Sequence, residues 1–279
     1  MSDDSPRAAG DGLADDARRR ALASPDARTR LAALEDLARA GRPLDEVDAL
    51  AVVDCLGFAM KALQRRAADV LRLSGDGARP AVLASLRAAL ASPDAARRWG
   101  ATYALGRLGI VDPVLVPPLL EALASRDGDQ RWAAAALMVE CGARHPATVL
   151  PALLDASRTA VPELRKMALY VLRDLASHDP RVPDALLTAV RDDDAGVRLA
   201  AVSALTRLAA APGRACDEVL RLVHEDPDVG VRRAAMSALG HLGRGVAGAA
   251  TAIAAACNSD DPGLRRAAEA ARRRLDGPA

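Results

Sequence analysis

The segment DVGVRRAAMSALGHLG, residues 228–243, decides the fold of this chain. If Arg232 is taken as position 0, Ala235 lies at +3 and Leu239 at +7, so both lie on one face of a helix. That spacing predicts an amphipathic helix with one buried face. Asp228, at position −4, lies where a carboxylate is favoured by the helix dipole. Gly243, at +11, suits the left-handed residue that ends a helix.

The same pattern recurs along the chain every 33 or 34 residues, which gives eight repeats. Position 0 is held by Arg30, Gln64, Arg98, Arg131, Arg165, Arg198, Arg232 and Arg265. Alanine stands at +3 in every repeat, and Leu or Met stands at +7 in all but the last, which has Arg272. From the second repeat on, an apolar residue stands twelve positions before position 0. It marks another helix, which is the first helix of each hairpin, and the helix with position 0 is the second. Each repeat is therefore predicted to be a helical hairpin that buries its apolar face only by stacking on its neighbours.

The composition agrees with an all-α fold. The chain has 279 residues, of which 51% are hydrophobic but only 2% aromatic. Such a core consists mainly of Ala, Leu and Val, which suits closely packed helices. The formal net charge is +1, so no overall basic excess indicates nucleic-acid binding.

Residues 1–20 are polar and rich in Asp and Gly, and we expect a disordered tail there. Residues 21–279 are expected to form a single solenoid domain, with a polar C-terminal cap at Arg272–Arg274. The chain shows neither a signal peptide nor a long uncharged apolar run. We therefore expect a cytoplasmic protein without a membrane partner.

The motif D-x-x-V-R-x-x-A-A-x-A-L-G-x-L-G over residues 228–243 resembles the HEAT-repeat family, specifically the short HEAT-like repeats of phycobilisome lyases. The resemblance covers residues 21–276 and implies a right-handed α-solenoid whose second helices line a concave face. It also implies that the columns at −4 and 0 form an Asp–Arg ladder that fixes the stacking. The ladder would comprise Asp26, Arg30, Asp94, Arg98, Asp127, Arg131, Arg165, Asp194, Arg198, Asp228, Arg232, Asp261 and Arg265.

Two repeats depart from the ladder. The second repeat has Met60 and Gln64 at the two ladder positions, and the fifth has Val161 before Arg165. Because a buried guanidinium without a partner is costly, we expect Arg165 to pair across repeats, with Asp127 or Asp194.

No catalytic constellation is found. The four histidines form no HExxH motif, the four cysteines form no CxxC pair, and no P-loop or nucleophile elbow is present. We therefore expect no catalytic residues, no metal and no cofactor, and we interpret the chain as a protein other than an enzyme. The cysteines are expected to be buried free thiols.

The aromatic residues depart from the repeat pattern in a way that suggests a binding surface. Both tryptophans and both tyrosines stand at +1 or +5, in columns that the resemblance places on the concave face, and all four fall in repeats three to five. These residues are Trp99, Tyr103, Trp132 and Tyr170, and Arg65 and Lys166 flank them at +1.

The predicted function is a non-catalytic scaffold that binds a segment of another protein on this face, because aromatic and Arg residues dominate binding energy at interfaces. One alternative is nucleic-acid binding, since bases stack on aromatic side chains beside Arg and Lys. Another is a small-molecule or chromophore site, as the resemblance to lyases suggests. Packing of the rings against neighbouring helices is the structural alternative. The sequence does not choose among partners.

Overall fold

A computed structural model describes residues 15–175, 179–208, 212–246 and 248–276. The chain forms two compact units, which divide between Leu119 and Leu120. Each is described by itself below, as the N-terminal unit and the C-terminal unit. That the two act as one solenoid domain over residues 21–279 stays a prediction.

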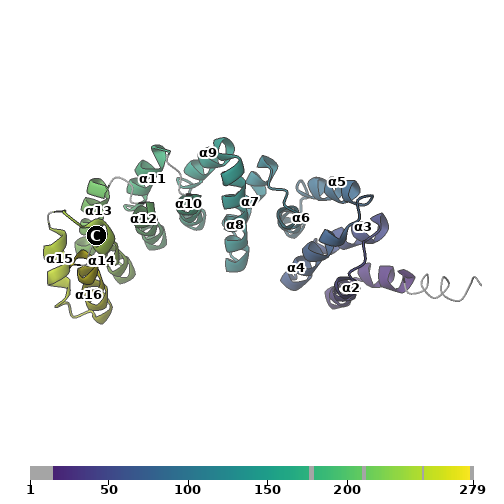
Figure 1. The fold of residues 1–279 in the computed structure, drawn as a ribbon, viewed down its shortest axis with the longest axis horizontal. Coiled ribbons are helices and arrows are strands. Elements are labelled where there is room, and N and C mark those ends of the chain that lie inside the picture. The colour runs from purple at the N-terminus through teal and green to yellow at the C-terminus, as the bar shows by residue number, and fades with distance from the viewer. Residues whose placement is uncertain (1–14, 176–178, 209–211, 247, 277–279) are drawn as a thin grey trace, which may run out of the picture. The chain divides into compact units, whose positions relative to one another are not determined.

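The N-terminal unit is a stack of helical hairpins. Its helices are α2 (Ala27–Ala40), α3 (Glu46–Cys55), α4 (Lys61–Val70), α5 (Arg79–Ala89) and α6 (Ala95–Arg107), with a short 3-10 turn, η1 (Leu71–Leu73). Helix α4 packs between α2 and α6, while α3 packs on α5 (Figure 1). The second helices of successive repeats thus form one layer and the first helices another. A further 3-10 turn, η2 (Pro113–Leu115), and α7 (Val116–Leu123) follow at the boundary of the units.

The C-terminal unit continues the same alternation. Its helices are α8 (Gly128–Arg144), α9 (Pro146–Ala156), α10 (Pro162–Leu175), α11 (Arg181–Ala189), α12 (Ala195–Leu208), α13 (Pro212–Glu225), α14 (Val229–Leu242), α15 (Ala249–Ala256) and α16 (Pro262–Asp276). Helices α8, α10, α12, α14 and α16 pack in sequence in one layer, and α9, α11, α13 and α15 in the other (Figure 1). This arrangement confirms the predicted α-solenoid.

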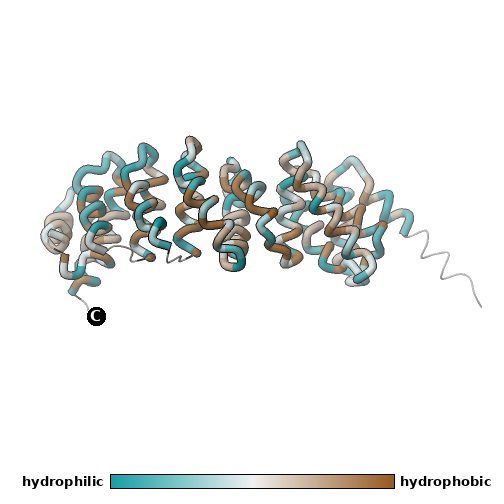
Figure 2. The backbone as a smooth tube through the Cα atoms, turned by 90° about the horizontal axis from the view of Figure 1, so that it is seen from above, coloured by the Kyte–Doolittle hydropathy of each residue, from teal (hydrophilic) through white to brown (hydrophobic). Residues whose placement is uncertain are grey.

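The predicted core columns are buried. Every alanine at +3 is at most 5% exposed, and every Leu or Met at +7 is at most 6% exposed. The apolar residue twelve positions before position 0, in the first helix of each hairpin, is buried in all cases except Leu220, which is half-buried. Hydrophobic and hydrophilic segments alternate along each helix accordingly (Figure 2). In α16 the run Arg272–Arg274 is exposed.

The left-handed helix ending predicted for the glycines at +11 is present at only some of them. Gly41 and Gly109 have φ values of 62° and 79°, which confirms the left-handed ending at those two positions. The prediction is wrong at the other three glycines of this column, because Gly142 lies inside α8, Gly243 ends α14 with a φ of −83°, and Gly75 has no positive φ. A Cβ at Gly142 would lie 2.7 Å from Cδ2 of Leu175, so this glycine serves the close approach of α10.

The N-terminal boundary requires a correction. Residues 15–22 form a helix, so the disordered tail expected over residues 1–20 is wrong for 15–20. Residues 1–14 lie outside the described residues. The physical reason is anchoring. Leu22 is fully buried, and Arg18 and Arg19 both bind the buried carboxylate of Asp48, at 2.6 and 2.8 Å.

The Asp column caps the second helices. Oδ1 of Asp194 accepts a hydrogen bond from the amide of Val197 at 3.0 Å, and Oδ1 of Asp228 accepts one from Val231 at 2.9 Å. The same kind of cap is made by Asp26, Asp94, Asp127 and Asp261. Such caps satisfy amides that the helix leaves unpaired. In the repeats of Asp26, Asp194, Asp228 and Asp261, the described contacts include no ion pair to the Arg four residues on. The implied Asp–Arg ladder stays a prediction, and the described contacts of these four repeats do not include it.

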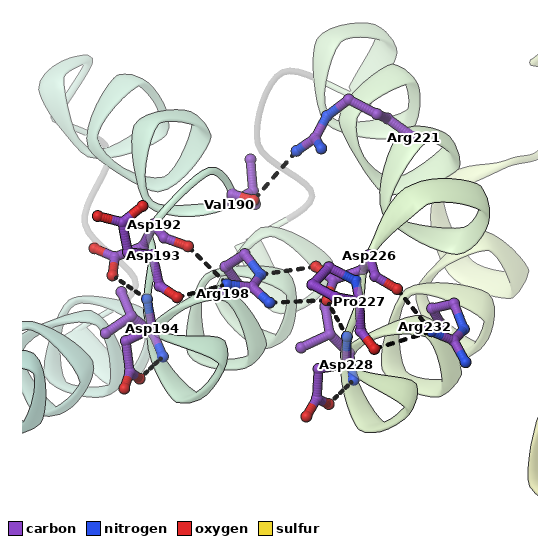
Figure 3. Close-up of polar contacts among 12 residues, drawn as sticks. Val190, Asp192, Asp193, Asp194, Arg198, Arg221, Asp226, Pro227, Asp228 and Arg232 are labelled. Atoms are coloured by element: carbon purple, nitrogen blue, oxygen red, sulfur yellow. Dashed lines mark hydrogen bonds and ion pairs between the residues drawn. The ribbon is translucent and has the colours of Figure 1, made fainter.

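The Arg column closes each hairpin instead. In seven repeats its guanidinium donates to the backbone carbonyl six residues earlier, in the turn between the two helices, at 2.5–3.0 Å. Arg198 donates to the carbonyls of both Asp192 and Asp193 (Figure 3). A hydrogen bond to a charged group contributes about 1.5–3 kcal/mol, so each Arg stabilises the turn of its own repeat.

Three of these arginines also bind the next repeat, and the first is Arg131, whose Nε lies 2.6 Å from Oε1 of Glu163. Arg165 pairs with Asp192 through two hydrogen bonds of 2.8 and 2.6 Å. Arg198 pairs with Asp226 in the same way, at 2.7 and 2.8 Å (Figure 3). The expected cross-repeat pairing of Arg165 is thus present, but neither expected partner is the one used. Asp192 and Asp226 stand at −6, where each also accepts the amide of the residue two positions on.

In the first two repeats, the contact of position 0 with the next repeat is made without an Arg–Asp pair. In the first repeat, the guanidinium of Arg30 lies over the ring of Phe58, 4.5 Å from its centroid, and Phe58 is the −6 residue of the second repeat. In the second repeat, the buried Gln64 donates to the carbonyls of Leu56 and Ala96, at 3.0 and 3.1 Å. Gln64 therefore joins two repeats without a charge.

Candidate functional site: an aromatic groove on the second helices

Trp132 and Tyr170 form a stacked pair on neighbouring second helices. Their ring centroids lie 5.5 Å apart with an interplanar angle of 29°. Trp132 is on α8 and is 51% exposed, so about half of its surface is accessible to solvent. Tyr170 is on α10 and is half-buried. The pair thus presents the exposed ring of Trp132 stacked on the half-buried ring of Tyr170.

Arg173 also contacts the ring of Tyr170. Its guanidinium carbon lies 4.9 Å from the ring centroid, a cation–π distance. Nε and Nη2 donate to the carboxylate of Asp174 at 2.8 and 3.0 Å, and Nη1 donates to Oγ of Ser203 at 3.1 Å. The hydrogen bonds to Asp174 raise the pKa of Arg173 above its ordinary value. Arg173 is therefore always charged, but Asp174 offsets its charge.

A groove with a volume of about 670 Å³ runs from this stack across four second helices. Its walls come from α8, α10, α12 and α14. The lining residues are Trp132, Tyr170, Arg173, Leu199, Val202, Ser203, Thr206, Arg207, Ala234, Ser237, Ala238 and His241. These positions recur at the same offsets in successive repeats, so stacking of the repeats brings them together. We call this surface the aromatic groove.

The remaining predicted site residues lie elsewhere. Lys166 does not line the aromatic groove, because its ammonium binds Glu163 at 2.7 Å. Trp99 and Tyr103 lie one turn apart on α6 in the N-terminal unit, with ring centroids 5.7 Å apart. Both are half-buried, and Arg65 on α4 is exposed. The structure therefore shows two aromatic pairs, one in each unit, and the prediction of a single patch stays untested.

Sequence reasoning missed the polar part of the aromatic groove. Arg173, Ser203, Thr206, Arg207 and His241 stand at +5, +8 or +9, whereas the sequence prediction rested on the aromatic residues at +1 and +5. The signal was available at +9, where Arg207 and His241 succeed each other in adjacent repeats. It was weak, because exposed columns of a repeat vary freely.

The described residues hold no cluster of three or more His, Cys, Asp or Glu side chains that could bind a metal. Cys55, Cys141 and Cys216 are buried free thiols, as predicted, and Cys257 is half-buried. Burial raises the pKa of the Cys55 and Cys216 thiols. Within the described part of the chain, every helix is too short or too polar to span a bilayer.

The stacked hairpins and the regular alternation of buried columns define an α-solenoid. The family model of HEAT repeats matches residues 116–206 and 183–272, which together make up more than half of the chain. The chain belongs to the HEAT-repeat family. A comparison with curated protein sequences found no match.

Solved structures share the fold at low sequence identity. The structure of YibA from Escherichia coli matches with a TM-score of 0.56 and 15% identity, over 98% of this chain and 99% of that one. The karyopherin Kap121p, solved with the extreme C-terminus of the protein phosphatase Cdc14p bound, matches with a TM-score of 0.61 and 14% identity. That match covers 92% of this chain and 33% of Kap121p. At these identities the similarity shows the fold.

Proposed function

We propose that the chain is a non-catalytic scaffold that binds an extended segment of a partner protein in the aromatic groove. The observation that carries this proposal is the exposure of Trp132. A tryptophan that is 51% exposed and already stacked on Tyr170 presents a large apolar surface without filling the core. Trp, Tyr and Arg are the residues that supply most of the binding energy at protein interfaces.

The residue types of the buried core also support a binding role for the aromatic residues. The buried hydrophobic residues of the described chain are Ala, Leu, Val, Met, Ile and Cys, with no Trp or Tyr among them. None of these four rings is therefore part of the fully buried core. They occupy the second-helix face, which the family resemblance predicts to be concave. Kap121p, which shares the fold, is solved with a protein segment bound, and this agrees with the proposed kind of partner.

The test is a selection of peptides from a random library displayed on phage, with the full chain as bait. Isolated peptides are then measured against the wild type, Trp132→Ala and the control Val161→Ala. Val161 is 46% exposed and does not line the aromatic groove. We expect Trp132→Ala to lose about 2 kcal/mol of binding free energy or more, while Val161→Ala binds as the wild type does.

Circular dichroism and thermal melts show whether each variant is folded. If the folded Trp132→Ala variant binds every selected peptide as tightly as the wild type does, the aromatic groove is not the binding surface and the proposal is wrong.

A further inference from the structure

The aromatic groove differs in charge from the other large hollow of the same unit. Among its twelve lining residues there is no Asp or Glu. The hollow beside α11 and α13 is lined by five carboxylates, which lie among four arginines. The carboxylates are those of Asp184, Asp192, Asp193, Asp217 and Glu218. The whole chain has nearly equal numbers of basic and acidic residues, 38 and 37. The absence of carboxylates from the groove lining is therefore a local property of this surface.

The positive charge of the aromatic groove that no carboxylate offsets is that of Arg207, and His241 stands at the same offset on the next helix. Arg207 on α12 and His241 on α14 both stand at +9, on adjacent helices, and both are exposed. Within the described residues, neither side chain makes a hydrogen bond or an ion pair, whereas Arg173 is paired with Asp174. The groove thus has an aromatic end at Trp132 and an unneutralised basic end at Arg207.

We propose that the segment bound in the aromatic groove is acidic. This inference rests on the proposed function and adds the chemistry of the partner. An apolar or aromatic side chain of the segment packs on Trp132, and Asp or Glu side chains further along it reach Arg207 and His241. The hydroxyl groups of Ser203 and Ser237 also line the aromatic groove and can hydrogen-bond to the segment.

The length of the segment follows from the helix spacing. Packed helices lie about 10 Å apart, so the path from Trp132 on α8 to Arg207 on α12, two helices away, covers roughly 20 Å. An extended chain spans about 3.3 Å per residue, so about six residues connect the apolar anchor to the carboxylates. A library of twelve-residue peptides is long enough to contain both features.

Charge favours a peptide over a single-stranded nucleic acid. A nucleic acid carries a phosphate on every nucleotide and needs a basic groove that follows its backbone. The aromatic groove offers Arg207 and His241, since Asp174 already offsets Arg173. Two basic side chains at one end fit a short run of carboxylates better than a continuous phosphate backbone.

The experiment uses the phage-selected peptides that depend on Trp132. We expect these peptides to be enriched in Asp and Glu relative to the unselected library. Replacing their carboxylates by amides should weaken binding about tenfold, as should Arg207→Glu, which removes one attraction and adds one repulsion. The control Arg266→Glu changes an exposed arginine outside the aromatic groove and should leave affinity unchanged. Binding should also weaken as salt is added.

The outcomes separate the two proposals. Trp132-dependent peptides without acidic enrichment, unaffected by Arg207→Glu, would overturn the acidic segment and leave the scaffold proposal standing. If no peptide depends on Trp132, the scaffold proposal itself fails. A twenty-residue oligothymidylate serves as the nucleic-acid probe. If it binds more tightly than any selected peptide and loses affinity in both Trp132→Ala and Arg207→Glu, the groove binds single strands and the acidic-peptide inference is wrong.

Discussion

Removal of the Asp226 carboxylate should destabilise the contact between α12 and α14 far more than removal of the carboxylate of Asp228, which caps α14. Asp226 is 4% exposed, and its oxygens accept two hydrogen bonds from Arg198, which is 8% exposed. Oδ1 also accepts the amide of Asp228 at 2.9 Å. The substitution Asp226→Ala removes all three acceptor contacts and leaves the guanidinium buried without its carboxylate (Figure 3).

The magnitude follows from this burial. Breaking a buried ion pair by removing one partner costs about 3–5 kcal/mol, because the remaining charge stays desolvated. Asp228 supplies the matched control, since it lies two residues on and its side chain accepts one amide, that of Val231. Loss of such a helix cap costs about 1 kcal/mol. Asp226→Ala should therefore cost at least about twice as much as Asp228→Ala.

The assay is urea unfolding followed by circular dichroism at a helical wavelength, combined with amide hydrogen exchange of α12 and α14. Exchange reports local opening, so the loss of protection should be greatest in those two helices. If Asp226→Ala costs no more than Asp228→Ala, the pair contributes no more than a cap, and the argument from burial is refuted.

The same pair predicts a pH dependence. Burial acts to raise the pKa of Asp226, but the hydrogen bonds from Arg198 and from the Asp228 amide hold it below its ordinary value. A carboxylate with a lowered pKa in the folded state stabilises the fold above its unfolded pKa, which is about 3.9. That stability is lost as the pH falls through the lower folded value. The difference in unfolding free energy between the wild type and Asp226→Asn should therefore shrink below about pH 4.

Three further predictions concern other parts of the structure. Gly100→Ala should cost about 1–3 kcal/mol or more in urea unfolding, since its Cβ would lie 2.3 Å from the Leu56 carbonyl oxygen. The control Gly77→Ala, which has no atom within 4 Å of that Cβ, should stay within about 0.5 kcal/mol of the wild type. Trp132→Ala should lower stability by about 1 kcal/mol, the value for an exposed aromatic pair; a loss of about 3–5 kcal/mol in a thermal melt would show instead that the ring is structural. Arg233 and the first amides of α16 lower the pKa of Asp261 to about 2, so its contribution is present above the unfolded pKa and lost towards pH 2. Acid titrations of Asp261→Asn should accordingly be flatter than those of the wild type, and equal slopes would contradict this reading.

The repeat and its buried face were predictable from the amino-acid sequence. Columns such as Ala235 and Leu239 recur with the helical period in repeat after repeat, and periodicity of this kind depends only on local geometry. The same is true of the helix starts, because a cap such as Asp228 acts within its own turn. The exposed aromatic columns could also be read from the sequence, once the register of the repeat was known.

The contacts between neighbouring repeats could not be predicted from the sequence and required the folded structure. Arg165 binds Asp192 because the turn of the following hairpin places that carboxylate beside it, and sequence spacing contains no measure of that distance. Gly142 looked like a helix end, yet it lies within a helix where Leu175 approaches too closely for a side chain. The basic end of the aromatic groove, with Arg207, became visible in the same way. A contact between repeats depends on how two helices pack, and that packing is the sum of many side-chain contacts, which no single column of the sequence contains.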